Sequence, residues 1–131
     1  VSNLLNGFVS SLSGSGSGFV DAGYDMFIGL VYAPGGCTVQ GTLTVSTSGP
    51  ANVYIGDWIS AMDYYAFIDG ASSYGSWSWI YQWYSTSYVN QPITFSTGYS
   101  GDYYVLIIEN PNNYDISYTY SLTISHVYCP P

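Results

Sequence analysis

The 131-residue sequence contains no Lys and no Arg, and a single His stands beside eight Asp and Glu residues, so the formal net charge at pH 7 is -8. Binding to nucleic acids and to anionic membrane surfaces depends on Lys and Arg, so we expect neither as a partner. Chemistry that needs a lysine or an arginine, such as Schiff-base formation or a phosphate clamp, is excluded as well.

Charged residues make up 6% of the chain, whereas 47% of the residues are hydrophobic and 19% are aromatic. Disordered chains combine low hydrophobicity with high charge, so this composition predicts a folded protein with one hydrophobic core. No segment reaches the ~18 to 20 consecutive apolar residues that a membrane-spanning helix needs.

The two cysteines, Cys37 and Cys129, are most simply joined in a disulfide, with two unpaired thiols as the alternative. A chain without Lys or Arg also offers trypsin-like proteases no cleavage site, which suits an extracellular protein. We therefore predict a secreted protein located outside the cell or at the cell surface. The absence of a basic leader segment predicts a mature form that has lost its signal peptide.

Motifs for catalysis are missing from the sequence. His126 is the single imidazole, no Gly-x-Ser-x-Gly motif occurs, and His126 with Cys129 supplies too few ligands for a zinc site. The spacing of the carboxylates selects neither a glycosidase pair nor a calcium loop among Asp57, Asp63, Asp69, Asp102 and Glu109. We predict a non-enzymatic protein with no catalytic residues, no cofactor and no bound metal.

The first 18 residues differ from the rest of the chain. Residues 1–12 are rich in apolar side chains, and an alternating Ser/Gly run through Gly18 follows them as a flexible spacer. The spacing of the apolar residues slightly favours a helix over a strand, and either form must be stabilised by docking. We predict an arm and spacer over 1–18 and a β-sandwich domain over 19–131. The apolar residues of the arm are Leu4, Leu5, Phe8, Val9 and Leu12.

From Phe19 onward, short alternating segments rich in β-branched and aromatic residues are separated by Gly, Pro and Asn turns, and no helix is expected. About eight strands at this spacing predict an all-β fold: an antiparallel, jelly-roll-like β-sandwich with an N-terminal apolar arm. The expected strands are Tyr24–Tyr32, Thr38–Ser46, Ala51–Ile55, Tyr64–Ile68, Trp77–Tyr84, Ile93–Ser96, Asp102–Glu109 and Tyr118–His126.

Three tryptophans alternate with polar residues in one of these expected strands, at positions 77, 79 and 83. Side chains at every second position share one face of a strand, so this face suits a sandwich core or a subunit interface, which we favour. As the alternative, Trp77, Trp79 and Trp83 stack on sugars in a secreted carbohydrate-binding or accessory module.

Several segments carry a resemblance to known families. Residues 41–45 (GTLTV), 92–95 (PITF), 100–111 (SGDYYVLIIENP) and 118–124 (YTYSLTI) are similar to β-sandwich domains of secreted archaeal and bacterial proteins, including the pre-peptidase C-terminal type. The apolar arm on a Gly/Ser spacer, ahead of a charge-poor body, resembles subunits of archaeal extracellular filaments of the thread and bundling-pilus kind. No Asn-x-Ser/Thr sequon is present, which departs from the glycosylated surfaces common on such filaments.

The filament resemblance implies a structural subunit that polymerises head to tail by donor-strand complementation and serves adhesion or contact between cells. The arm of one subunit would insert into the sheet of the next, so the main partner is a second copy of this chain, with surface glycans or other cells as further partners. We expect a receiving groove walled by apolar strand residues, namely Met26, Ile28, Leu30, Val105 and Ile107.

Overall fold

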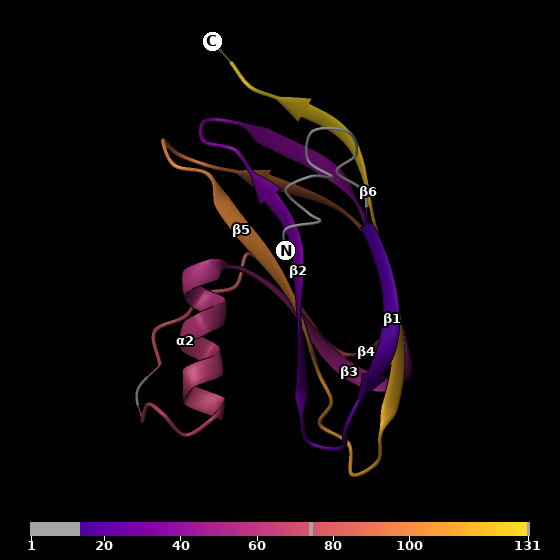
Figure 1. Ribbon diagram of the computed structural model, residues 1–131. Helices are drawn as coiled ribbons and strands as arrows, with labels where there is room; N and C mark the ends of the chain where they lie inside the picture. Colours follow the sequence, from indigo (N-terminus) through magenta and orange to yellow (C-terminus); the bar gives the residue numbers. More distant parts are fainter. Residues whose placement is uncertain (1–13, 74, 131) are drawn as a thin grey trace.

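The computed structural model describes residues 14–73 and 75–130. This part of the chain folds into strands with one helix, as Figure 1 shows. The elements are β1 (Gly14–Val20), β2 (Asp25–Ala33), β3 (Thr38–Asp57), α2 (Trp58–Ile68), β4 (Tyr81–Ser96), β5 (Asp102–Glu109) and β6 (Ile116–Tyr128). Every strand pair is antiparallel, which confirms the predicted all-β antiparallel fold.

The two long strands β3 and β4 connect the two layers of the sandwich. The strand order is β1-β6-β3-β5-β2, and β4 pairs with β3 outside this path. Residues 38–47 of β3 pair with β6 and residues 52–57 pair with β5, while β4 follows β3 through both halves. The sheet therefore curls over on itself, and its inner face encloses the main core (Figure 1).

Six strands replace the expected eight in the described residues, because two pairs of expected strands merge into β3 and β4, one expected strand is helical, and β1 is additional. Thr38–Ser46 and Ala51–Ile55 are the two halves of β3, and the register against β4 shifts between Ser46 and Ala51. Pro50 lies within this irregular stretch, where a residue without an N–H is tolerated in a sheet. A Ser-Gly-Pro sequence that predicts a turn thus marks a bend within one strand.

The predicted strand at Tyr64–Ile68 is wrong, because these residues belong to α2. Asp57 caps the helix, since its Oδ1 accepts a hydrogen bond from the backbone N–H of Ser60 at 2.8 Å. Gly70, with φ of 79°, follows the end of the helix in the left-handed conformation that glycine adopts without strain. Ala61 and Tyr64 pack against the outer face of β5, so tertiary burial stabilises a helix whose aromatic content resembles that of a strand.

The predicted strand at Trp77–Tyr84 is wrong in its first half, because β4 begins at Tyr81. The predicted disulfide is confirmed, since Cys37 and Cys129 are bonded across a sequence separation of 92 residues. The bond attaches the end of the described chain to the loop between β2 and β3. A disulfide indicates an oxidising compartment, outside the cell or in a periplasm.

The expectation of a flexible spacer is wrong for residues 14–18, which form most of β1 and pair with β6. The absence of a Cβ at two of these glycines makes room for tyrosine rings. An added Cβ at Gly16 would lie 2.8 Å from Cε1 of Tyr120, and one at Gly18 would lie 2.9 Å from Oη of Tyr118. Two tyrosine rings of β6 therefore cover the inner face of β1, and the folded body includes residues 14–18 as well as 19–73 and 75–130.

Substitution of these glycines should separate packing from chain flexibility. Gly18→Ala should lower the free energy of unfolding by about 1–3 kcal/mol, because the nearly buried Tyr118 ring must move. Gly14→Ala is the matched control on the same strand, since nothing lies within 4 Å of its added Cβ. This control should be neutral or stabilising by about 0.4–1 kcal/mol. Urea denaturation of both variants measures the difference, and equal stabilities would contradict the packing role.

Candidate functional site

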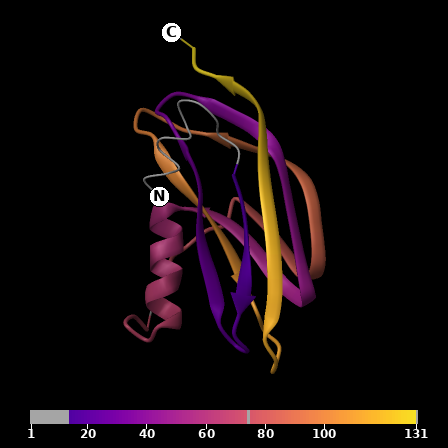
Figure 2. The same cartoon turned by 45° about the vertical axis from the view of Figure 1, so that its right-hand side comes forward.

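One side of the sandwich is bounded by the edge strands β1 and β2, which begin and end the strand order. The two strands lie apart along most of their length in Figure 1, and a turn joins their lower ends in Figures 1 and 2. The inward positions of β1 are glycines, so this strand contributes little side-chain volume to the core. On β2, Met26 and Ile28 pack against the main core but remain only partly buried. We call Gly16, Gly18, Met26 and Ile28 the β1–β2 seam.

The five residues expected to wall one groove lie on two faces of the sheet. Met26, Ile28 and Leu30 face the main core, where Leu30 is fully buried. Val105 and Ile107 of β5 face outward and, together with Tyr54 of β3, are buried against Ala61 and Tyr64 of α2. The prediction that these five residues wall one groove is therefore wrong. β5 is apolar on both faces because α2 covers its outer face, a partner that the sequence prediction lacked.

The predicted arm residues Leu4, Leu5, Phe8, Val9 and Leu12 lie outside the described residues. Their role as a donor strand stays a prediction.

The three tryptophans do not share one face. Trp79 stacks on Tyr54, with ring centroids 4.9 Å apart, and Trp77 contacts Tyr64 at 5.2 Å, both on the side of the sheet that α2 covers. Trp83 instead stacks on Tyr81 at 5.7 Å and packs against the main core. The prediction of a single tryptophan face is wrong because residues 77–79 are not part of a strand, and the three rings form no common platform for a sugar.

A second feature of the structure is a row of polar side chains on the face that α2 covers. Asp25 of β2 is paired in register with Glu109 of β5, which is paired in turn with Asn52 of β3. Oε1 of Glu109 accepts hydrogen bonds from Nδ2 of Asn52 at 2.9 Å and from Oη of Tyr54 at 2.7 Å. Oη of Tyr64 donates to Oδ2 of Asp25 at 2.7 Å. Neutral donors therefore hold both carboxylates.

The pKa values in this row follow from burial without a nearby cation. Burial raises the pKa of Asp25 from 3.8 to about 6; repulsion by Glu109 adds to the rise, and the hydrogen bond from Tyr64 opposes it. Burial, followed by the acceptor carboxylates, raises the pKa of Tyr54 and Tyr64 well above the usual value, so both hydroxyls stay protonated donors.

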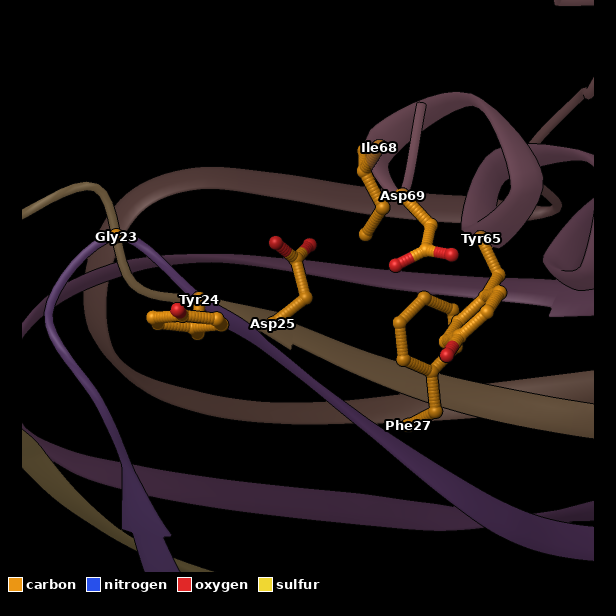
Figure 3. A pocket seen from close by; sticks show the side chains of 7 residues that line it. All are labelled: Gly23, Tyr24, Asp25, Phe27, Tyr65, Ile68 and Asp69. Atoms are coloured by element: carbon orange, nitrogen blue, oxygen red, sulfur yellow. The ribbon is translucent and has the colours of Figure 1, made fainter. Parts of the chain in front are cut away.

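Asp25 also lines a surface hollow between the β1–β2 turn and the end of α2 (Figure 3). The hollow has a volume of about 280 Å³ and is lined by Gly23, Tyr24, Asp25, Phe27, Tyr65, Ile68 and Asp69. The carboxylates of Asp25 and Asp69 point toward the space between them, and the rings of Tyr24 and Tyr65 stand on either side. We call this feature the Asp25–Asp69 hollow.

Asp25 was not singled out from the sequence, and no pairing was found among the carboxylates that include Asp69 and Glu109. The signal that was available is an acid at the end of an apolar strand in both segments, DMFIGLVYA and DYYVLIIE. An antiparallel pairing of these strands brings Asp25 opposite Glu109. The hollow itself could not be predicted, because residues of α2 line it and no helix was expected.

Within residues 14–73 and 75–130, no group of three or more His, Cys, Asp or Glu residues is placed to hold a metal ion. In the same ranges, no helix combines the length and the apolar character required to cross a membrane.

No family model matches the chain, and none of the curated proteins matches it. Among solved structures, the chain is similar to the mitogen derived from Yersinia pseudotuberculosis, with a TM-score of 0.48, 12% identity and coverage of 91% of this chain and 97% of that chain. A periplasmic inhibitor of g-type lysozyme from Aeromonas hydrophila gives a TM-score of 0.46 and 17% identity over 86% of both chains. A structure described as CBM4 gives a TM-score of 0.41 and 10% identity, with 87% of this chain and 82% of that chain covered. Likenesses this distant carry no argument about function.

The pKa of Asp25 predicts that acid stabilises the fold. Because its folded pKa lies above its ordinary value of 3.8, the stabilisation is complete below that value and is lost as pH rises through about 6. The carboxyl group is partly open to solvent, so we expect a loss of about 1 kcal/mol in the free energy of unfolding between pH ~4 and pH ~7.

Asp25→Asn should remove this part of the pH dependence, because asparagine has no charge to desolvate and still accepts a hydrogen bond from Tyr64. Asp102→Asn, at the opposite end of the β2–β5 pair, is the control and should keep it. Urea denaturation at several pH values measures both. An unchanged pH profile in Asp25→Asn would contradict the assignment.

Proposed function

We propose that this protein is a structural subunit of a secreted extracellular filament, in which the N-terminal arm of one subunit adds to the sheet of the next. The observation that carries the proposal is the β1–β2 seam, where the strand order ends in β1 and β2 and two apolar side chains of β2, Met26 and Ile28, remain only partly buried. An added strand forms main-chain hydrogen bonds with a sheet edge, and its alternate side chains bind in the space below it.

The side chains of the seam fit an apolar donor. The rings of Tyr118 and Tyr120 already cover the inner face of Gly16 and Gly18, so the apolar surface open to a donor is that of the partly buried Met26 and Ile28 on β2. The arm carries apolar residues at positions 4, 5, 8, 9 and 12, with smaller or polar residues between them. Insertion of such side chains would remove apolar surface from water on both partners.

The contact between subunits would not depend on ion pairs. The chain has no Lys or Arg, β1 carries no charged residue, and Asp25 at the start of β2 is the single charged residue of that strand. A head-to-tail contact of this kind does not close on itself, so it extends into a filament. Adhesion or contact between cells is the role that we propose for such a filament.

The alternative function, a carbohydrate-binding or accessory module that uses Trp77, Trp79 and Trp83, is less well supported. The first two rings pack beneath α2 and the third packs on the opposite face of the sheet.

Two complementary variants test the proposed polymerisation. Phe8→Asp should prevent the arm from inserting, and Ile28→Asp should block the seam, so each variant alone should remain monomeric in size-exclusion chromatography. Mixing them should restore one contact, because one variant keeps its seam and the other keeps its arm. The expected product is a 1:1 dimer that cannot extend further.

Tyr99→Asp is the control, because Tyr99 is fully exposed in the loop between β4 and β5, and this variant should form filaments like the original protein. Circular dichroism checks that each variant is folded, and Ile28→Asn replaces Ile28→Asp if the charge prevents folding. Filaments formed by either single variant, or a mixture that stays monomeric, would overturn the proposal.

A further inference from the structure

The Asp25–Asp69 hollow has two carboxylates and no cation to balance them. Oδ2 of Asp25 accepts the hydrogen bond from Tyr64, and among the described residues no hydrogen bond or ion pair reaches the carboxylate of Asp69. Both groups point into the hollow (Figure 3), and Glu109 adds a third negative charge behind Asp25. Their mutual repulsion makes the hollow a favourable place for a positive charge.

The end of α2 adds to this preference. Asp69 occupies the C-cap position, and the last turn of the helix contains no basic residue. The carbonyl groups at a helix C-terminus carry partial negative charge, so a cation stabilises this position and a carboxylate does not. The carboxylate of Asp69 therefore stands where helix energetics favour the opposite charge, and a bound cation would offset that cost.

Aromatic rings form the walls of the hollow. Tyr24 is 67% exposed and Tyr65 is 50% exposed, and Phe27 meets the ring of Tyr65 edge to face at a centroid distance of 5.4 Å. The faces of aromatic rings attract cations, and such rings together with carboxylates bind ammonium groups in proteins. Ile68 completes the lining with an apolar surface that suits methyl or methylene groups.

Other classes of ligand fit the hollow less well. A hard divalent cation such as calcium takes six to eight oxygen ligands, whereas two carboxylates line this hollow. Repulsion opposes an anion. A neutral sugar could stack on the tyrosines but would leave the paired negative charges without compensation.

We propose that the Asp25–Asp69 hollow binds an alkylammonium group, with the nitrogen between the two carboxylates and the alkyl part against Tyr65 and Ile68. A lysine side chain and a trimethylammonium head group share this chemistry. No copy of this chain carries a lysine or an arginine, so a lysine side chain or a trimethylammonium head group in the hollow must come from a different molecule. This site goes beyond the proposed polymerisation. The hollow and the seam use different residues, although both include residues of β2.

The test is a titration of the full chain followed by amide chemical shifts in NMR. The probes are Nα-acetyl-lysine amide, which represents a protein partner, and choline, which represents a lipid or small-molecule source. The uncharged isostere of choline, 3,3-dimethylbutan-1-ol, and methyl glucoside are the comparison ligands. We expect millimolar binding of one or both ammonium probes, with shifts concentrated at residues 23–27 and 65–69, and weaker binding of both comparison ligands.

Variants then connect binding to the named groups. Asp25→Asn, Asp69→Asn and Tyr24→Ser should each weaken binding by about threefold to tenfold. Asp102→Asn and Tyr99→Ser, which change the same residue types away from the hollow, should leave it unchanged. Acidification through pH ~6 should weaken binding in the original protein, because Asp25 then takes up a proton beside Glu109 and Asp69.

Tighter binding of the lysine probe would assign a protein partner, and tighter binding of choline would assign a choline-bearing one. Equal binding of the uncharged isostere, preferential binding of methyl glucoside, or no shift at residues 23–27 and 65–69 with any probe would overturn the proposal. The polymerisation experiment is independent of these outcomes, because the seam and arm variants leave the hollow's carboxylates and tyrosines unchanged.

Discussion

The absence of any Lys or Arg is the constraint on which the rest of this structure depends, because every carboxylate must be satisfied by a neutral group or by water. Asp57 caps α2 through the N–H of Ser60, and Asp115 accepts a hydrogen bond from the N–H of Ala22 at 2.9 Å. Glu109 is held by an amide and a phenol. Charge-free donors of this kind need fixed geometry, so the acids of this chain contribute to helix and turn positions rather than to ion pairs.

This constraint also explains why tyrosine is so abundant beneath α2. Tyr54 and Tyr64 each bury most of an aromatic ring and direct the hydroxyl to a carboxylate, so one side chain provides core volume and a hydrogen-bond donor. A lysine in the same place would bring a charge whose burial is costly. The helix is therefore attached to the sheet by an aromatic cluster with a polar rim, and the position of its C-terminal end defines the hollow beside Asp25.

The strands were largely predictable because their signal is local. Asp102–Glu109 was predicted with its observed bounds, since its continuous apolar run and its flanking turns lie within one short segment. Two features were not predictable in this way, because both depend on distant partners. One is the helix α2, and the other is the place of the Gly/Ser run in strand β1. Gly16 and Gly18 resemble a linker until the rings of Tyr118 and Tyr120 are seen to occupy the space of their side chains. The position of Asp25 opposite Glu109 could be predicted only from the β2–β5 register.

The same absence of positive charge divides the surface into two kinds of contact. Copies of this chain repel one another through a net charge of -8 and have no lysine or arginine with which to balance it, so their association must rest on apolar burial and main-chain hydrogen bonds. Edge strands such as β1 and β2 provide both. An acidic hollow, in contrast, finds no complementary side chain on another copy and selects a partner of different composition. The proposed self-assembly and the proposed binding of an alkylammonium group are thus separated by charge, and one surface need not interfere with the other.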